Sequence, residues 1–446
     1  MNKIKTAWWL SLVFLSAAWI FAEPSLFNTT EIIPMRNLIV QYSGILAMGW
    51  MSLAMILAAR PKFSETWFGG LDKMYRLHKW LGISVAVLSF SHWLTVKAPK
   101  WAVALGILER TKRGPRPEAA TLIENWISSQ RGLAEVIGEW TFFGALILIA
   151  IALTKKISYR TFYKSHLLFS VIYLGLVFHT VVLTKYSYWT TPLGLVMLPL
   201  LLCGAIAAVL SLFRKIGIQH QSIGKIERVE YFPGVKTLEI CIQDLKGWHG
   251  HRPGQFAFVT TSQAKEAHPF TIASAWHEKD AKITFVVKEL GDYTKTLRES
   301  LQVEQEVKIE GPYGCFTFDD TRPTQIWIGG GIGIAPFIAR MKFLAENKNS
   351  KNQTIYLFHP TAQADDHALE KLNADAKAAG VHLHVFVDTQ EQHLSGETIR
   401  KVVPEWQNSS FWFCGPVGLA EALKTDFSKA GQPIDKLFHQ ELFEMR

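Results

Sequence analysis

Six apolar segments in the first half of this chain limit its possible folds more than any other feature of the sequence. They cover approximately residues 7–22, 38–58, 75–96, 133–153, 162–183 and 189–213. A helix needs about 20 apolar residues to cross the hydrocarbon core of a bilayer, and most of the six segments reach that length. The sequence therefore predicts a bundle of six transmembrane helices over residues 1–216. The first segment also resembles a signal peptide, but we expect it to be retained as a helix.

Basic residues lie on one side of the predicted bundle. They occur before the first segment, between the second and third, between the fourth and fifth, and after the sixth. Short loops rich in Lys and Arg stay on the cytoplasmic side of a membrane. We therefore expect a multi-pass protein of the cell (inner or plasma) membrane, with its N-terminus and everything after residue 216 in the cytoplasm. The long loop 97–131 departs from this pattern, because Arg110, Lys112, Arg113 and Arg116 would lie outside.

Four histidines form matched pairs on two of the segments. His78 and His92 are 14 residues apart on the third segment, and His166 and His179 are 13 residues apart on the fifth. An α-helix rises about 1.5 Å per residue, so each step climbs roughly 20 Å. Because the two segments run in the same direction, His78 pairs by depth with His166 near the cytoplasmic face, and His92 with His179 near the outer face. Ionisable residues in membrane helices are rare and usually functional. The pattern predicts two haems, each held between two histidines.

The fifth segment fits this picture less simply than the third. Thirteen residues turn a helix by about 1300°, which leaves His166 and His179 roughly 140° apart around its axis. Local tightening, a bend near Gly175 or helix crossing must reconcile their directions. Gly82, one turn beyond His78, leaves space in which a porphyrin could lie.

Charge and cysteine usage exclude two other classes of protein. The net charge of +9 is compatible with nucleic-acid binding, but the second half has no Lys/Arg-rich run with interleaved aromatics. The four cysteines are far apart and form no CxxC or zinc-like spacing. We therefore expect no nucleic acid, no disulfide framework and no metal site built on thiolates.

The pattern of residues 217–322 changes to short alternating strands, near 224–231, 235–242 and 255–260. Such strands predict a small antiparallel β-barrel. Four motifs follow in order: Arg-Pro-Gly-Gln-Phe at 252–256, His-Pro-Phe-Thr-Ile at 268–272, Lys-Glu-Leu-Gly-Asp-Tyr-Thr at 288–294, and Gly-Pro-Tyr-Gly at 311–314. The stretch 291–294 opens a predicted helix, and free N–H groups at a helix N-terminus suit a pyrophosphate.

Residues 323–446 predict an open parallel α/β sheet, with strands near 326–328, 355–358, 382–387 and 411–413 alternating with helices. A glycine-rich loop at 329–336 follows the first of these strands and precedes a helix through about residue 346. Glycines in that context allow close approach of the backbone to a phosphate. Cys414 ends the last strand, where such sheets bind ligands, so we expect it to contact the nicotinamide; the alternative is a small buried residue.

Taken in this order, the motifs resemble those of the ferric reductase and NADPH oxidase superfamily, in which a six-helix haem domain is fused to a ferredoxin–NADP reductase-like module. The resemblance covers almost the whole chain and implies FAD, two b-type haems and NAD(P)H as electron donor. The residues that it implies for the flavin are His268, Pro269, Phe270, Thr271, Lys288, Gly291, Tyr293 and Thr294. Those that it implies for the dinucleotide are Gly329, Gly330, Gly331, Gly333, Pro336, Cys414, Gly415 and Pro416.

The C-terminal segment 439–443 also resembles that of the family, whose aromatic residue covers the flavin ring. This implies a catalytic position for Phe443, together with Cys414, although three residues follow Phe443 here. Many relatives that use NADPH carry an arginine after the second strand of the α/β domain. The corresponding stretch 358–366 has no Arg or Lys and contains Asp365 and Asp366, which favours NADH. No calcium-binding loop precedes the first helix.

These features predict a transmembrane oxidoreductase that carries electrons from cytoplasmic NAD(P)H through FAD and two bis-histidine haems to an external acceptor. With both axial positions of each iron filled by histidine, the acceptor must react at the haem edge. Oxygen, giving superoxide, and ferric chelates are both candidates, and Arg36 is a candidate acceptor-site residue by position. Two alternatives stay open: a membrane electron donor for a dedicated periplasmic redox partner, and a channel or transporter with a regulatory nucleotide domain and no haem.

Overall fold

The computed structural model describes residues 2–109, 121–154, 156–262, 266–347, 353–388, 393–431, 434 and 436–441. The chain divides into two compact units. One comprises Met1–Phe68 and Lys73–Ile216, and the other contains Gly217–Glu444. Each unit has its own architecture.

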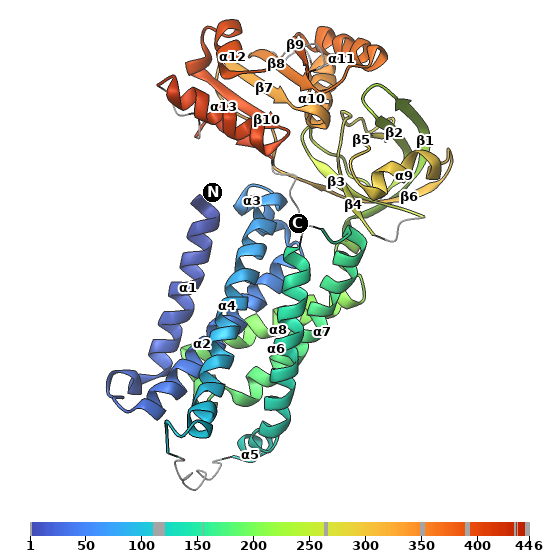
Figure 1. Cartoon of the computed structure of the whole chain (residues 1–446). Helices are drawn as coiled ribbons and strands as arrows, with labels where there is room; N and C mark the ends of the chain where they lie inside the picture. The colour runs from blue at the N-terminus through green and yellow to red at the C-terminus, as the bar shows by residue number, and fades with distance from the viewer. Residues whose placement is uncertain are drawn as a thin grey trace. The chain divides into compact units, whose positions relative to one another are not determined.

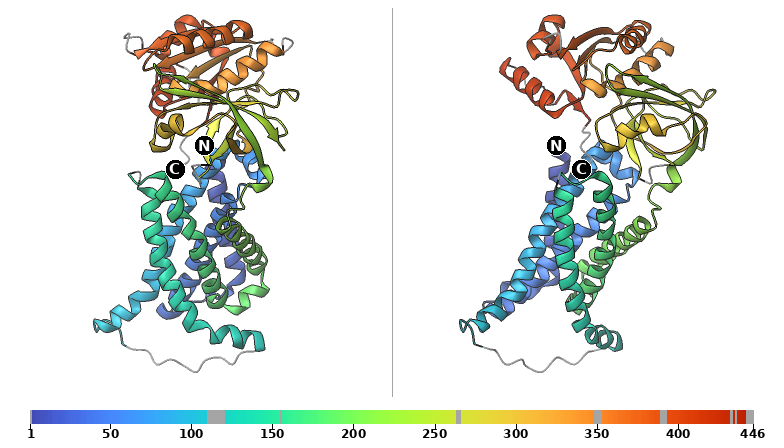
Figure 2. Two further views of the ribbon diagram at one scale, coloured as in Figure 1. Left: turned by 90° about the vertical axis from the view of Figure 1, so that its right-hand side faces the viewer. Right: turned by 45° about the vertical axis from the view of Figure 1, so that its right-hand side comes forward.

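Helices alone make up the first unit (Figure 1). Among the described residues, six helices are long and apolar enough to cross a membrane. The helices and 3-10 turns of this unit are α1 (Asn2–Ala22), η1 (Pro24–Phe27), α2 (Ile32–Ala58), α3 (Lys62–Phe68), α4 (Leu71–Ala104), α5 (Leu122–Ser129), α6 (Arg131–Leu153), α7 (Tyr159–Leu183), η2 (Tyr186–Thr190) and α8 (Pro192–Leu212). The long helices run side by side in all three views (Figures 1 and 2). The predicted six-helix membrane bundle is confirmed.

Helix bounds differ from the sequence prediction mainly at polar ends. The third membrane helix, α4, continues through Pro99 to Ala104, and the sixth begins at Pro192 after the 3-10 turn η2. Proline suits the first turn of a helix because the N–H that it lacks has no helical partner there. The short helices α3 and α5 were not predicted, since neither is long or uniformly apolar.

Helix α1 packs into the bundle. Leu15 is 1% exposed and lies so close to Gly49 of α2 that a Cβ atom there would be 2.6 Å from its Cδ1. Polar contacts add to this packing, because Ser16 and Tyr42 share a hydrogen bond of 2.7 Å between their hydroxyls. At the end of α1, buried Glu23 accepts hydrogen bonds from Lys185 and Tyr188, which tie it to the segment between α7 and α8. The first helix is therefore an integral part of this unit.

The second unit begins with an antiparallel sheet. Its strands are β1 (Gln221–Phe232), β2 (Thr237–Lys246), β3 (Phe256–Thr261), β4 (His268–Thr271), β5 (Ile283–Lys288) and β6 (Glu306–Tyr313), in the order β4-β3-β6-β1-β2-β5, with α9 (Asp292–Ser300) before β6. An isolated bridge between Ile272 and Phe285 joins the two edges of the sheet, which curls into a half-barrel around an apolar core. Pro269 lies in β4, an edge strand, where a missing N–H is tolerated. The predicted β-barrel domain is confirmed.

A parallel sheet follows, in the order β11-β10-β7-β8-β9 over the described residues. Its elements are β7 (Thr324–Gly329), η4 (Gly331–Ile334), α10 (Ala335–Glu346), β8 (Thr354–Thr361), α11 (Asp366–Ala379), β9 (His382–Val387), α12 (Gly396–Val402), η7 (Trp406–Asn408), β10 (Ser409–Cys414), α13 (Val417–Lys429) and β11 (Phe438–Gln440). Alternate residues of β7 and β10 pack into two apolar clusters, one with α10 and α11 and the other with α12 and α13. Helices therefore cover both faces, as the predicted α/β domain requires.

Candidate functional site

The inner pair of membrane histidines comes together in the helical unit. His78 on α4 and His166 on α7 have ring centroids 5.9 Å apart, with their planes inclined at 56°. A ligating imidazole nitrogen lies about 2 Å from its metal, so two imidazoles on opposite sides of one ion have centroids about 6 Å apart. The rings therefore stand at the separation that an ion between them requires.

The outer histidines, His92 on α4 and His179 on α7, are close enough to interact electrostatically. The ring of His179 lies against the backbone of α6, where a Cβ on Gly138 would be 2.0 Å from its Nδ1 atom. The His179 side chain thus reaches toward α6 through a gap that only glycine leaves open. This close approach shows where the 13-residue spacing directs the second ring of α7.

Hydrogen bonds set the tautomer of three of these four rings. His78 Nδ1 lies 2.9 Å from the carbonyl oxygen of Ala54, and His179 Nδ1 lies 2.8 Å from that of Ala134. A carbonyl oxygen only accepts, so each Nδ1 carries the proton and donates it. Each Nε2 then keeps a lone pair that is available to a metal.

His92 reaches the same state through a hydroxyl group. Its Nδ1 lies 3.0 Å from Ser43 Oγ, which donates its own proton to the carbonyl of Ile39 at 2.7 Å. Ser43 Oγ must therefore accept from His92 Nδ1–H, and Nε2 of His92 is again unprotonated. His166 differs, because its buried Nδ1 has no hydrogen-bond partner among the described residues.

These donors fit haem better than a metal held by protein ligands alone. Among the described residues, no group of three or more His, Cys, Asp or Glu side chains could hold a metal ion. Two imidazoles per level suit an iron whose other four ligands come from a porphyrin. A Cβ added to Gly82 would meet no atom within 4 Å, so the space one turn beyond His78 is open.

Arg36 has a structural role that its sequence position did not reveal. Pro99 lacks an N–H group, so the carbonyl oxygen of Thr95 in α4 loses its helical donor. Arg36 Nε donates to this oxygen and Nη2 donates to that of Val96, both at 3.1 Å. The guanidinium group thereby binds α2 to the outer part of α4, three residues beyond His92.

On the flavin side, the structure brings two predicted motifs together. His268 of β4 stacks on Tyr293 of α9, with ring centroids 3.7 Å apart and planes inclined at 10°. Burial lowers the pKa of His268 to about 4, so its ring is neutral near pH 7 and offers no positive charge to a phosphate. Phe270 packs against the apolar core of the half-barrel, and Pro269 and Thr271 pair with β3.

The start of α9 is ordered by the side chain of Thr294. Gly291 is its N-cap, and the N–H groups of Leu290 and Gly291 both donate to Thr294 Oγ1, at 2.9 and 3.0 Å. A Cβ on Gly291 would meet no atom within 4 Å. The space at this helix N-terminus is therefore open, as close approach of a pyrophosphate requires.

Ligands of open α/β sheets bind where the strand order reverses, which here is between β7 and β10. Both predicted dinucleotide motifs lie at this point, and Gly330 N donates to the carbonyl oxygen of Cys414 at 2.9 Å. A Cβ on Gly333 would lie 2.1 Å from that oxygen, so only glycine allows η4 to approach β10 so closely. Gly331 has a φ of +53° and open space beside it. Pro336 lies in the first turn of α10, and Gly415 and Pro416 follow β10.

Cys414 is fully buried, and its thiol lies in the apolar cluster beneath α10 and α11. Burial raises the pKa of this thiol well above its usual range. Contact of its side chain with a nicotinamide therefore stays a prediction. Phe443 and the basic loop segment 110–116 lie outside the described residues, so their predicted roles also stay predictions.

A cleft lies between the half-barrel and the α/β sheet. Lys288 of β5 and Thr237 of β2 line one side, while Gly331, His359 and Lys342 line the other. Lys288, which the sequence groups with the flavin motif, therefore also shares a cleft with the glycine-rich loop.

Asp365 is held in place by two backbone N–H groups. One of its carboxylate oxygens caps α11 by accepting from Ala368 N at 3.1 Å, and the other accepts from Gly234 N at 2.9 Å. Both oxygens are engaged by neutral donors, so Asp365 is fixed in place and keeps its negative charge. The preference for NADH stays a prediction.

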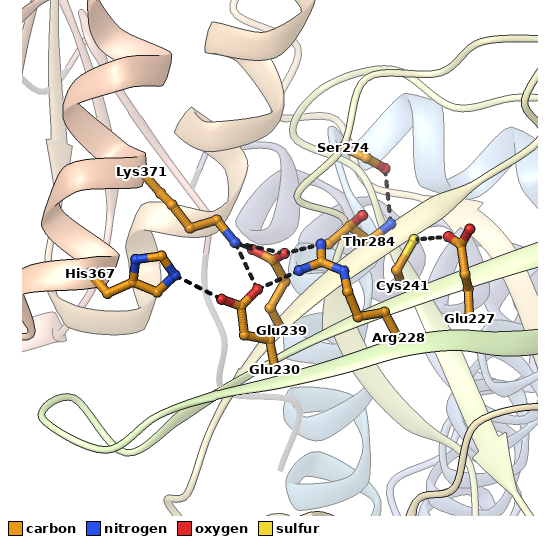
Figure 3. A network of polar contacts seen from close by, with 9 residues as sticks. All are labelled: Glu227, Arg228, Glu230, Glu239, Cys241, Ser274, Thr284, His367 and Lys371. Carbon is orange, nitrogen blue, oxygen red and sulfur yellow. Dashed lines mark hydrogen bonds and ion pairs between the residues drawn. The ribbon is translucent and has the colours of Figure 1, made fainter.

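A charged network beside the cleft holds α11 against the β1–β2 hairpin (Figure 3). Lys371 Nζ lies 3.0 Å from both carboxylate oxygens of Glu239 and 3.1 Å from Glu230 Oε2. Arg228 pairs with the same two carboxylates, and His367 Nε2 lies 3.0 Å from Glu230 Oε1. Glu239 lines the cleft, but its charge is neutralised by Lys371 and Arg228.

Sequence reasoning missed His359 and the partners that orient the membrane histidines. His359 lies near the carboxyl end of β8. Strand ends at this edge of an open α/β sheet carry ligand-binding residues, so its position could have identified it. Ala54, Ser43 and Ala134 carried no signal, because they lie on helices distant in sequence from the histidines they contact.

Comparison with known proteins identifies two parts of the chain. Residues 43–177 match the family described as ferric reductase like transmembrane component, and residues 223–317 match an FAD-binding domain family. A respiratory burst oxidase homolog, protein E of Arabidopsis thaliana, is 27% identical over 45% of this chain and 23% of its own length. Ferric reduction oxidase 5 of the same plant is 31% identical over 27% of this chain and 18% of its own length.

A reductase component is also among the relatives. The reductase component of propane 2-monooxygenase from Mycolicibacterium smegmatis is 25% identical over 46% of this chain and 64% of its own length. The chain thus spans less than two thirds of each of these relatives. Among solved structures, a cytochrome P450 reductase of Amycolatopsis has a TM-score of 0.43 and 21% identity, over 50% of this chain and 69% of its own.

Proposed function

We propose that this chain is a transmembrane oxidoreductase, because residues 43–177 match a ferric reductase like transmembrane component and residues 223–317 match an FAD-binding domain. It carries electrons from cytoplasmic NAD(P)H to an acceptor on the other side of the membrane. FAD and two b-type haems are its bound cofactors. When bound, these cofactors supply the one-electron carriers that connect a two-electron hydride donor with an acceptor across the bilayer.

The observation that carries this proposal is the state of the membrane histidines. His78, His92 and His179 each donate from Nδ1 to a neighbouring helix, which leaves Nε2 unprotonated. The rings lie at two levels roughly 20 Å apart along α4 and α7. In this proposal, His78 and His166 hold the inner haem and His92 and His179 the outer one. Their backbone and hydroxyl partners keep each ring in the ligating tautomer.

The second unit supplies the electron-donating half of the proposal. His268–Thr271 of β4 and the N-terminus of α9 would hold the flavin and its pyrophosphate. The glycine-rich loop from Gly329 and the Cys414–Pro416 turn would hold the dinucleotide at the switch point of the sheet. Contact of Cys414 with the nicotinamide, and cover of the flavin ring by Phe443, belong to the same proposal.

Basic loops support a cytoplasmic position for the N-terminus and the second unit in a plasma or inner membrane. The acceptor would then react outside, at the level of His92 and His179. Oxygen and ferric chelates are the proposed acceptors.

An absorption spectrum tests the electron path. Purified protein should show a b-type haem signal on reduction with NADH. Replacing both His78 and His166 by Ala should halve the haem content and leave a haem that dithionite reduces but NADH does not. A matched control replaces His382 and His384 by Ala, because these two histidines lie on strand β9 of the second unit. Absence of the haem signal in the wild type, or unchanged haem content in the membrane double variant, would refute the proposal.

The acceptor requires a second assay on the same preparation. Cytochrome c reduction that superoxide dismutase abolishes would identify oxygen as acceptor. Ferric-chelate reduction that dismutase does not affect would identify a ferric reductase. Inertness toward both, with haem that NADH still reduces, would instead favour the alternative of a dedicated redox partner.

A further inference from the structure

His359 stands in the wall of the cleft described above, at the carboxyl end of β8. Its side chain is 7% exposed, and Nδ1 lies 2.6 Å from the carbonyl oxygen of Gly329. That oxygen belongs to the last residue of β7, immediately before the glycine-rich loop. The ring is therefore held between the two strands whose ends border the expected dinucleotide site.

The contact with Gly329 decides what the rest of the ring offers to a ligand. A carbonyl oxygen only accepts, so Nδ1 of His359 carries the proton. Burial lowers the pKa of His359, and the positive charge of Lys288 also disfavours a second proton. The ring is then neutral near pH 7, and its Nε2 is a hydrogen-bond acceptor.

An acceptor at this position distinguishes the two nicotinamide dinucleotides. In sheets of this kind, the end of the second strand carries the group that recognises the 2′ position of the adenosine ribose, and an acidic residue is the usual acceptor. Asp365 is held at the start of α11 by the N–H groups of Ala368 and Gly234, whereas His359 is held between the ends of β7 and β8. A ribose hydroxyl can donate to an imidazole nitrogen, whereas an ionised phosphate has no proton to donate.

Positive charge in the cleft has a separate explanation. Lys288 and Lys342 line it, and neither ammonium group forms a hydrogen bond or an ion pair with another described residue, although Lys342 lies near the carboxyl group of Asp375. Lys371 is already paired with Glu230 and Glu239 (Figure 3). Two unpaired ammonium groups beside the glycine-rich loop suit a pyrophosphate, which both dinucleotides contain.

We propose that His359 accepts a hydrogen bond from the 2′-hydroxyl of the adenosine ribose and thereby makes the cleft prefer NADH to NADPH. This inference rests on the proposed function in one respect, that a nicotinamide dinucleotide is the electron donor. His359 acts here as a specificity-determining residue and takes no part in the redox step.

Calorimetric titration of the full-length, FAD-loaded protein with NAD⁺ and with NADP⁺ tests the assignment without any turnover. The informative variant is His359→Asn, whose amide can still donate to the Gly329 carbonyl but presents no acceptor at the Nε2 position. We expect a three- to tenfold weaker affinity for NAD⁺, about the worth of one neutral hydrogen bond. Affinity for NADP⁺ should change less than twofold.

Two further variants separate recognition from structure. His382→Asn makes the same substitution on the adjacent strand β9 and should leave both affinities unchanged. Lys288→Ala should weaken both dinucleotides by similar factors, because it removes a charge from their common pyrophosphate. Equal weakening of both dinucleotides by His359→Asn, no effect of this variant, wild-type preference for NADP⁺, or a loss in Lys288→Ala confined to NADP⁺ would each overturn the proposal.

The haem spectrum of the same samples distinguishes this inference from the proposed electron path. A wild type that has no haem signal but prefers NAD⁺ through His359 would refute the electron path and support the inference. Haem reduced normally by NADH, with His359→Asn unchanged in both affinities, would refute the inference alone.

Discussion

Gly138 provides a sharp test of whether His179 is a haem ligand. A Cβ atom at this position of α6 would lie 2.0 Å from Nδ1, 2.2 Å from Cε1 and 2.8 Å from Cγ of His179. Non-bonded heavy atoms prefer about 3.5–4.0 Å, so Gly138→Ala must move the ring by roughly 1.5 Å. That shift would break the 2.8 Å hydrogen bond from Nδ1 to the Ala134 carbonyl.

The Gly138→Ala substitution should change the stability of the bundle little, but it should displace the His179 ring too far for it to bind iron. Overpacking costs about 1–3 kcal/mol and the lost hydrogen bond about 1 kcal/mol, while Ala in place of Gly returns about 1 kcal/mol of helix propensity. The bundle should therefore still form. A functional side chain, however, must stay within about 0.5 Å of its productive position. The displacement of the His179 ring is about three times this tolerance, so the ring should no longer bind the iron.

The assay is the haem-to-protein ratio of purified protein, with a redox titration of its absorption spectrum. Gly138→Ala should retain one haem per chain, at the level of His78 and His166, instead of two. Gly144→Ala on the same helix is the control, because its Cβ would meet only the terminal Cδ1 of Ile172, at 3.1 Å. Two haems with unchanged potentials in Gly138→Ala would show that His179 is not a ligand.

Three other perturbations address the stability of the two units. Arg36→Ala removes both donors to the carbonyls of α4 and should lower the free energy of unfolding by about 2 kcal/mol. An unchanged thermal midpoint in detergent would contradict a stabilising role of these two hydrogen bonds. Asp320 accepts hydrogen bonds from Ser410, Trp412 and Gln325. Asp320→Ala should therefore lower the free energy of unfolding of the second unit by about 3 kcal/mol. The temperature at which released flavin becomes fluorescent measures this loss, and flavin release at the wild-type temperature would contradict it. Burial lowers the pKa of His251 from 6.5 to about 4. The unfolded chain then takes up a proton first as the pH falls, and stability should drop by up to about 3 kcal/mol between pH 6.5 and 4. Urea unfolding of wild type and His251→Gln should show a shallower loss in the variant, and parallel losses would refute this cause.

Much of the fold could be predicted because its signals are local in sequence. The membrane helices could be predicted from the length of their apolar segments. Strands β7 and β10 could be predicted from short apolar runs that are followed by glycine. The two histidine pairs also follow from local geometry, since the rise per residue of a helix sets their depths. Helix ends were harder to predict, because polar contacts such as that of Arg36 extend α4 beyond its apolar stretch.

The chemistry of individual side chains could not be predicted in the same way. Asp365 looked like a free carboxylate beside the dinucleotide, but two backbone N–H groups occupy its oxygens. His359 looked unremarkable, yet its contact with Gly329 turns its ring into a fixed acceptor. The partners Gly234 of Asp365 and Gly329 of His359 lie far away in sequence, and no local pattern identifies them.

The sequence by itself thus determined the membrane bundle, the order of the flavin and dinucleotide modules, and the depth at which each histidine stands. These features depend on hydrophobicity and on helix and strand periods, which are properties of neighbouring residues. Only the tertiary structure decided which nitrogen is free in three of the four membrane imidazoles, which carboxylates are paired with cations, and which residues face the cleft beside Gly331. Such properties depend on hydrogen-bond partners and burial, and these arise only when distant segments pack together.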